Sequence, residues 1–118
     1  RYIRMSDPDI DSAVEIATEL LRQKDPPTAI FGANDVIAIG AIKAALRLGL
    51  RIPRDVAIVG YDDSSSCRTT EPELTSVHID RMRMGQICVE KLQALLRGEE
   101  IAEQVTVLQP WLNIRGSS

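Results

Sequence analysis

The segment AIFGAND at 29–35 is echoed by AIVGYDD at 57–63, and each position of the second copy lies 28 residues after its counterpart. In both copies a continuous apolar run contains a glycine and ends in polar side chains. Such a run, bounded by turn residues, is typical of a parallel strand that is buried on both faces. We therefore expect strands at 28–33 and 56–60, with the first in the centre of a sheet.

The segment between the two copies predicts a helix over 35–48, which ends at Gly49 as a left-handed cap. Because strand, helix and strand follow one another, they form a βαβ unit, whose right-handed crossover makes the two strands parallel. The helix is apolar almost all round, and a helix that is apolar on two sides is usually covered on two sides. We expect the sheet to be one cover and a partner subunit to be the other.

Two further helices are predicted, one beginning at Asp9 or Asp11 and one over 80–97. Residues 62–76 have the Ser, Thr, Pro and Asp content of a loop, and LTSVHI at 74–79, which overlaps its end, is typical of a short extended segment. The fold class that these elements define is α/β, with a parallel βαβ sheet flanked by helices.

Length, charge and cysteine content narrow the class of protein. A chain of 118 residues suits one domain with a modest core, and a net charge of −3 argues against a nucleic-acid-binding surface. Two cysteines, Cys67 and Cys88, predict free thiols in a reducing, cytoplasmic setting. No apolar run is long enough to cross a membrane. Because the chain opens on Arg1 without an initiator Met, we expect a fragment of a longer protein.

The polar residues at the strand ends are the candidate ligand-binding groups. Asn34 and Asp35 follow the first strand, and Asp62 and Asp63 follow the second. In parallel α/β sheets the ligand crevice lies beyond the carboxyl ends of the strands. An Asn and an Asp one strand apart can together bracket the hydroxyl or amino groups of a small polar molecule. Local roles stay open beside this one: Asp35 can cap the helix, and Asp63 can accept from loop amides in an Asx-turn.

Catalysis has little support in the sequence. Asp35, Asp62 and Asp63 would suit a metal-dependent enzyme, but no Gly-rich phosphate loop accompanies them. The lone His78 has no marked base partner, and the SSSC segment at 64–67 lacks the pattern of a nucleophile elbow. We expect no catalytic residue, no metal and no cofactor.

Three longer motifs carry a resemblance to a known family. They are PTAIFGANDVIAIG at 27–40, GLRIPRDVAIVGYDD at 49–63 and PELTSV at 72–77. Together they resemble the second half of the effector-binding core of the lac/gal repressor family, over residues 7–118. The resemblance implies one lobe of a two-lobed, periplasmic-binding-protein-like fold. It also implies that 1–78 and 108–118 form the C-terminal lobe, and that 79–107 packs in the N-terminal lobe of a full protein.

The resemblance further implies what this lobe does. Asn34 and Asp62 match family residues that reach a small-molecule effector, a sugar or a nucleobase-like compound. The helix after the first strand and the loop 64–72 match the surface of a homodimer. The interface residues that follow from this match are Val36, Ile39, Lys43, Thr69 and Thr70.

The function implied is the effector-sensing and dimerisation module of a bacterial transcriptional repressor in the cytoplasm. Operator DNA would be bound only through an N-terminal helix-turn-helix domain that this chain lacks. The alternative is a fragment of a periplasmic solute-binding protein for sugars, which shares the fold.

Overall fold

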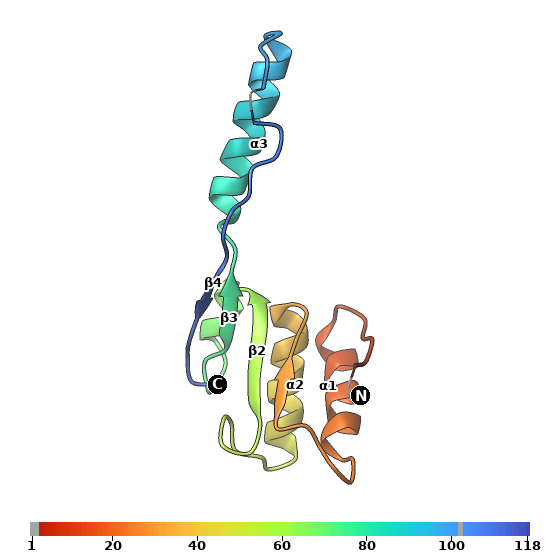
Figure 1. Ribbon diagram of the computed structural model, residues 1–118. Helices are drawn as coiled ribbons and strands as arrows, with labels where there is room; N and C mark the ends of the chain where they lie inside the picture. Colours follow the sequence, from red (N-terminus) through yellow and green to blue (C-terminus); the bar gives the residue numbers. More distant parts are fainter. Residues whose placement is uncertain (1–2, 102) are drawn as a thin grey trace. The chain divides into compact units, whose positions relative to one another are not determined.

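The computed structural model describes residues 3–101 and 103–118. The elements run α1, β1, α2, β2, the short 3₁₀ helix η1, β3, α3 and β4 (Figure 1). Their bounds are α1 Ile10–Leu21, β1 Ala29–Phe31, α2 Asp35–Arg47, β2 Ala57–Asp62, η1 Ser65–Arg68, β3 Thr75–His78, α3 Arg81–Leu96 and β4 Trp111–Asn113. The predicted α/β class is confirmed.

The sheet has the strand order β1-β2-β3-β4, and both β1 with β2 and β2 with β3 pair in parallel. Ala29 lies opposite Ala57 and Phe31 lies opposite Val59, so paired residues are 28 positions apart. The echo seen in the sequence is therefore the register of the ladder. The prediction of two neighbouring parallel strands is confirmed.

The prediction that the first strand is central and buried on both faces is wrong for this chain. Within the described residues β1 is the edge strand, and its residues alternate exposed, half-buried and exposed. Ile30 packs against the core, whereas the Phe31 side chain is 62% exposed. The apolar run correctly indicates a strand, but within the described residues β1 has one neighbouring strand, and its residues alternate between exposed and half-buried positions.

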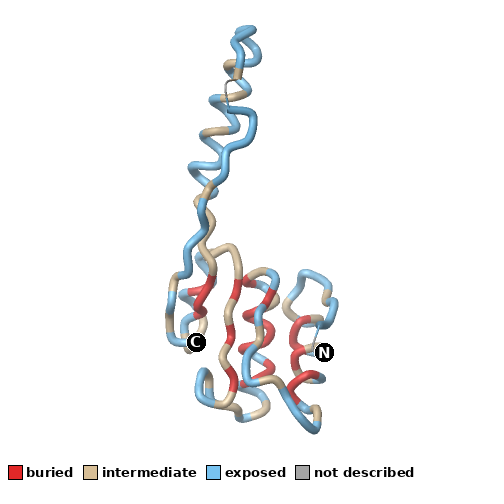
Figure 2. The backbone as a smooth tube through the Cα atoms, viewed as in Figure 1, coloured by how far each residue is buried: buried red, intermediate tan, exposed pale blue. Residues whose placement is uncertain are grey.

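The core lies where α1 and α2 pack together and α2 lies on β2. Its buried side chains include Val14 and Leu21 from α1, Ile42 from α2 and Ile58 from β2. Figure 2 shows buried positions along both helices and along β2. The second cover of α2 is thus α1 of the same chain, which corrects the expectation that a partner subunit supplies it.

The C-terminal tail is hydrogen-bonded to β2 and β3 through Ser117. Ser117 is buried, its Oγ donates to the Ile58 carbonyl at 2.6 Å, and the Ile58 N–H donates to the Ser117 carbonyl at 2.7 Å. The Thr75 N–H donates to Ser117 Oγ at 2.8 Å. A chain segment more than 40 residues away in sequence therefore supplies hydrogen bonds to two strands.

The chain divides into two compact units, 1–78 with 112–118 and 79–111. In the second unit no residue of α3 is buried, and Lys91 Nζ donates to the carbonyls of Glu103 and Gln104 at 2.6 and 3.2 Å. The assignment of 79–107 to the other lobe of a longer protein stays a prediction. No helix among the described residues is long and apolar enough to span a membrane.

A single glycine sets how closely α1 and α2 approach. A Cβ added at Gly40 would lie 2.4 Å from Ala13 Cβ and 3.0 Å from the Ile10 carbonyl oxygen. We expect Gly40→Ala to lower the free energy of unfolding by about 1–3 kcal/mol, because the helices must separate or distort. Urea unfolding followed by circular dichroism measures it.

Gly85 in α3 is the matched control, since a Cβ there meets nothing within 4 Å. Gly85→Ala should stabilise its helix by about 0.5–1 kcal/mol. Adding Ala13→Gly to Gly40→Ala should restore part of the loss. If Gly40→Ala behaves like Gly85→Ala, the helices are not in close contact at Gly40.

Candidate functional site

Asn34 follows β1 and begins α2. Its Oδ1 accepts the Ile37 N–H at 2.9 Å, so Asn34 is the N-cap of α2. The suggestion that Asp35 caps this helix is therefore wrong. Because the cap occupies Oδ1, the amide nitrogen Nδ2 is the group that Asn34 can offer to a ligand.

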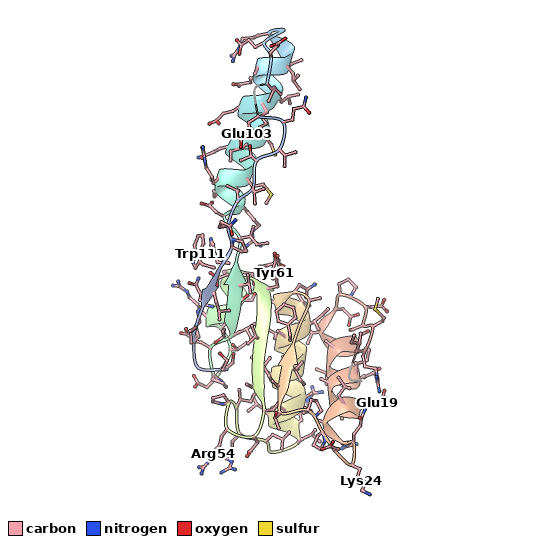
Figure 3. All side chains as sticks on the ribbon, viewed as in Figure 1. Glu19, Lys24, Arg54, Tyr61, Glu103 and Trp111 are labelled. Atoms are coloured by element: carbon pink, nitrogen blue, oxygen red, sulfur yellow. The ribbon has the colours of Figure 1, made fainter. Side chains whose placement is uncertain are left out.

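Asp62 is the last residue of β2, where it lies opposite His78 in the ladder. Its φ is 108°, and that of Asp63 is 49°. Two consecutive non-glycine residues with positive φ are costly, and such strain persists only where the surroundings hold it. β2 therefore ends in a turn whose shape depends on the contacts of the residues that follow. Figure 3 places Tyr61 at this end of β2 and Arg54 at the opposite end.

Asp35, the first residue of α2, connects that helix to β3 and to the segment that follows β2. It is only 2% exposed, and it accepts Ser76 Oγ–H from β3 and the Ser64 N–H, both at 2.6 Å. Gly60 makes room for it, since a Cβ there would lie 2.6 Å from Asp35 Oδ1. The carboxylate of Asp35 thus fixes the start of α2 relative to β2 and β3.

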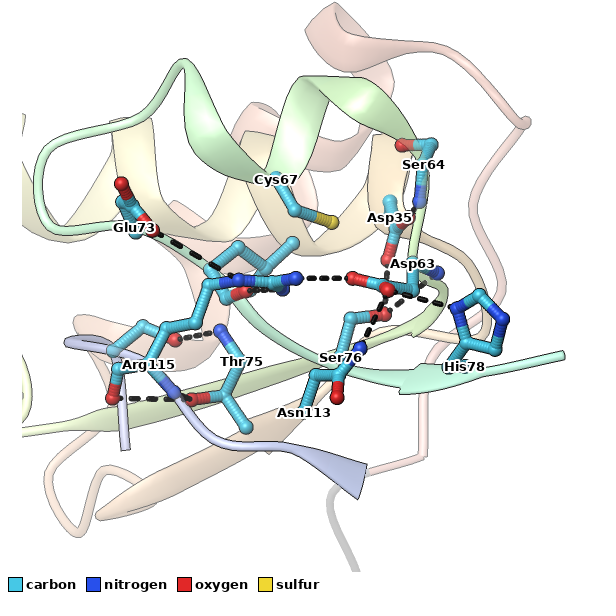
Figure 4. A network of polar contacts seen from close by, with 12 residues as sticks. Asp35, Asp63, Ser64, Cys67, Glu73, Thr75, Ser76, His78, Asn113 and Arg115 are labelled. Carbon is cyan, nitrogen blue, oxygen red and sulfur yellow. Dashed lines mark hydrogen bonds and ion pairs between the residues drawn. The ribbon is translucent and has the colours of Figure 1, made fainter. Parts of the chain in front are cut away.

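Asp63 is the centre of a second set of contacts, shown in Figure 4. Its Oδ1 accepts from Arg115 Nη2 at 2.5 Å, and its Oδ2 accepts from Asn113 Nδ2 at 2.7 Å and His78 Nδ1 at 2.9 Å. Its N–H donates to Ser76 Oγ at 3.1 Å. We call Asp63, His78, Asn113 and Arg115 the Asp63 cluster. These distant partners replace the Asx-turn that was one expectation for Asp63.

The electrostatics of the cluster favour a charged Asp63. Burial raises the pKa of the Asp63 carboxyl, but the hydrogen bonds from Arg115, His78 and Asn113 outweigh that effect and leave the pKa below its ordinary value. The Arg115 side chain is 11% exposed, and its Nη1 also donates to the Leu74 carbonyl at 2.7 Å. A largely buried guanidinium with fixed acceptors is thus paired with the carboxylate.

The structure gives the other candidate chemical groups local roles. Burial, followed by the nearby Asp35, raises the pKa of the Cys67 thiol to about 11, so this cysteine stays protonated and unreactive at neutral pH. Over the described ranges, no group of three or more His, Cys, Asp or Glu side chains is arranged to hold a metal ion. Asp35 and Asp63 already accept hydrogen bonds from serine, arginine, histidine and asparagine.

A groove of about 520 Å³ lies between the N-terminal segment, α1, β1 and α2. Its wall includes Met5, Leu20 and Phe31, and the residues that line it include neither Asn34 nor Asp62. The groove marks the uncovered side of β1 and is separate from the predicted ligand-binding residues.

The residues predicted at a dimer interface differ in exposure. Lys43 and Thr69 are exposed, Val36 is 38% exposed and Thr70 is half-buried. Ile39 is only 7% exposed and belongs to the core of this chain. A substitution at Ile39 would therefore disturb folding before it disturbed any contact between subunits.

The contributions of Arg115, Asn113 and Ser76 were missed by sequence reasoning. Asn113 and Arg115 lie 50 and 52 residues from Asp63, so no local spacing connects them. The one available signal was Arg115 among the apolar residues of WLNIRG, since a charged side chain in such a segment usually has a partner when it is buried.

Comparison with known proteins supports the relationship that the motifs indicate. The chain belongs to the periplasmic binding protein-like domain family, whose model matches residues 1–118. The predicted relationship to lac/gal repressors is confirmed, because similar proteins include a transcriptional repressor, a LacI family regulator and the lac repressor.

The HTH-type transcriptional repressor PurR of Proteus mirabilis is 40% identical over 107 residues, which cover 90% of this chain and 31% of that protein. The LacI family transcriptional regulator from Arthrobacter in complex with lactose is 30% identical with a TM-score of 0.86, covering 95% of this chain and 42% of the regulator. The lac repressor dimer bound to operator and the anti-inducer ONPF is 31% identical with a TM-score of 0.87, and the match covers 96% of this chain and 39% of the repressor chain. The chain thus spans about a third of its curated relative.

The lowered pKa of Asp63 predicts an acid-sensitive contribution to stability. A carboxyl whose folded pKa lies below the unfolded value of 3.8 contributes fully above that pH and loses its contribution as the pH falls through the folded pKa. We expect Asp63→Asn to be less stable than the wild type at pH 5, with the difference shrinking below about pH 4. Urea unfolding from pH 5 to pH 2 measures both proteins. A constant difference over that range would show that Asp63 is not held charged by its partners.

Proposed function

We propose that this chain is the effector-sensing and dimerisation part of a bacterial transcriptional repressor. The observation that carries the proposal is the placement of Asn34 and Asp62 at the carboxyl ends of neighbouring parallel strands. That edge is where open α/β sheets bind ligands. Membership of the periplasmic binding protein-like domain family supports a binding role for these positions, beyond the capping that Asn34 also performs.

The chemistry of the two side chains suits a small polar effector. Asn34 Nδ2 donates, and the Asp62 carboxylate accepts from hydroxyl or ring N–H groups. A sugar or a nucleobase-like compound presents such groups at a spacing that two adjacent strands can meet. The lactose complex of a relative supports the sugar class.

The effector would be enclosed by two lobes, of which this chain supplies most of one. Residues 1–78 and 108–118 form that lobe in the proposal, and 79–107 completes the other lobe. The exposed apolar side chains of α3, including Leu92 and Leu95, are consistent with a helix that packs on further chain. DNA binding would belong to a separate N-terminal part of a cytoplasmic protein. That a related lac repressor dimer binds operator supports a DNA-binding role for the longer protein.

A binding role fits the site better than an enzymatic one, because Asp35 and Asp63 accept hydrogen bonds from neighbouring residues and the buried Cys67 thiol is protonated. A fragment of a periplasmic sugar-binding protein is the second candidate, since it would share the fold. The relatives are repressors, which favours the first.

The role of Asp62 can be tested in a full-length protein that carries this chain. We expect Asp62→Ala to abolish the response of operator binding to the effector while operator affinity itself stays unchanged. Loss of the acceptor leaves ligand hydroxyl or N–H groups unpaired, which costs on the order of 1–3 kcal/mol. Fluorescence anisotropy of labelled operator DNA, titrated with lactose, cellobiose, guanine and hypoxanthine, provides the measurement.

Asp55→Ala is the control, because Asp55 is a carboxylate that pairs with Arg51 on the surface, at the opposite end of β2. This variant should respond as the wild type does. An Asp62→Ala protein with a normal response would remove Asp62 from the binding site.

The proposed dimer surface lies on the exposed side of α2. Val36 and Lys43 are exposed there, whereas the Ile39 side chain is buried in the core. We expect Val36→Glu to shift the protein toward monomer, because it places a charge in an apolar contact that is repeated by two-fold symmetry. Sedimentation velocity at micromolar concentration measures the shift, with Glu15→Gln on α1 as a surface control. If wild type and Val36→Glu sediment alike as dimers, the interface lies elsewhere.

A further inference from the structure

The chain leaves its first compact unit after His78 and returns to it at Leu112. We call these two points the crossings. A residue that contacts Asp63 lies next to each of them. His78 ends β3 at the first crossing, and Asn113 follows the second. We propose that Asp63 is a positioning residue that ties both crossings to the end of β2 and, through the shared turn, orients the neighbouring Asp62.

The hydrogen bonds on Oδ2 carry the first half of this inference. Asn113 Nδ2 donates at 2.7 Å and His78 Nδ1 lies at 2.9 Å. Because a carboxylate only accepts hydrogen bonds, His78 must hold its proton on Nδ1 for this contact. Oδ2 of Asp63 thus joins His78, the last residue before the chain leaves the unit, to Asn113, the second residue after it returns.

The opposite oxygen anchors the carboxylate to the body of the unit. Oδ1 accepts from Arg115 Nη2, and the same guanidinium donates through Nη1 to the Leu74 carbonyl just before β3. Leu74 is fully buried in the core. The Asp63 cluster is therefore fixed to the core on one side and to the two crossings on the other.

The backbone carries the second half of the inference, which rests on the proposed function. Asp62 and Asp63 both have positive φ, and Asp63 N–H donates to Ser76 Oγ, which in turn donates to Asp35. A turn of this kind keeps its shape only while its contacts hold it. Removing the acceptors of Asp63 should let the turn relax and change the direction in which Asp62 presents its carboxylate.

Amide hydrogen exchange on this chain tests the first half without any ligand. In Asp63→Asn we expect exchange at 77–79 and 112–115 to accelerate about tenfold more than in β2 and α2, whose exchange changes only with the global free energy of unfolding. Asparagine tolerates the left-handed backbone as well as aspartate does, so the variant removes the charge and one acceptor without adding strain. Asp55→Asn removes a carboxylate from the surface pair with Arg51 and should change neither segment.

Two results would overturn the inference. One is unchanged exchange at both crossings in Asp63→Asn. The other is an even acceleration across the whole first unit, since that would mean general destabilisation. Asn113→Ala sharpens the test, because it should accelerate exchange at 112–115 and leave 77–79 protected.

Ligand binding by a full-length protein carrying this chain tests the second half. Calorimetry with lactose, cellobiose, guanine and hypoxanthine identifies a probe that binds the wild type. We expect Asp63→Asn to weaken its binding about tenfold, with Asp55→Asn unchanged. Normal binding by Asp63→Asn would overturn the link to Asp62. If no probe binds the wild type, the proposed function fails together with that link, and the exchange experiment alone decides whether Asp63 holds the crossings.

Discussion

A buried carboxylate is stable only when hydrogen-bond donors replace the water it has lost, and Asp35 meets that requirement by joining three elements. Its two oxygens accept from Ser76 on β3 and from the backbone after β2, while its own backbone opens α2. The helix N-terminus adds a favourable field for the negative charge. Because these donors come from separate segments, the carboxyl ends of the strands are fixed relative to the helix. Asn34 and Asp62 lie at those ends, so their placement depends on this interaction.

The part of the fold that the sequence could predict is the part governed by short-range rules. The interval between AIFGAND and AIVGYDD became the register of β1 and β2, because a βαβ unit with a continuous helix leaves little freedom in how the strands align. The end of α2 at Gly49 and the opening of α1 at Asp9 likewise follow from local capping. The edge at which Asn34 and Asp62 lie is a consequence of the same topology.

Which strands, helices and side chains pack against each element could not be predicted, because the hydrophobic periodicity of an element does not identify its neighbours. The apolar pattern of 28–33 indicates a strand suited to burial, yet Ala29 and Phe31 are exposed because the described chain supplies only one neighbouring strand and one covered face. The apolar pattern of α2 predicts a second covered side but not what covers it: α1 lies there, close enough that Gly40 faces Ala13, and not a partner subunit. The partners of Asp63 are some 50 residues distant and come from a tail with no distinctive motif.

The two adjacent carboxylates at the end of β2 have different roles: Asp63 holds the turn in place, and Asp62 is the residue proposed to contact the effector. Asp63 uses both oxygens on Arg115, Asn113 and His78, so it has little capacity left for a ligand. Asp62 is the residue proposed to meet the effector, and an extended backbone would simply carry the two side chains to opposite faces. The positive φ values at both residues replace that alternation with a turn. The strain of this turn is acceptable because the contacts of Asp63 oppose its relaxation, and the binding residue thereby acquires a defined direction from a neighbour that need never touch the ligand.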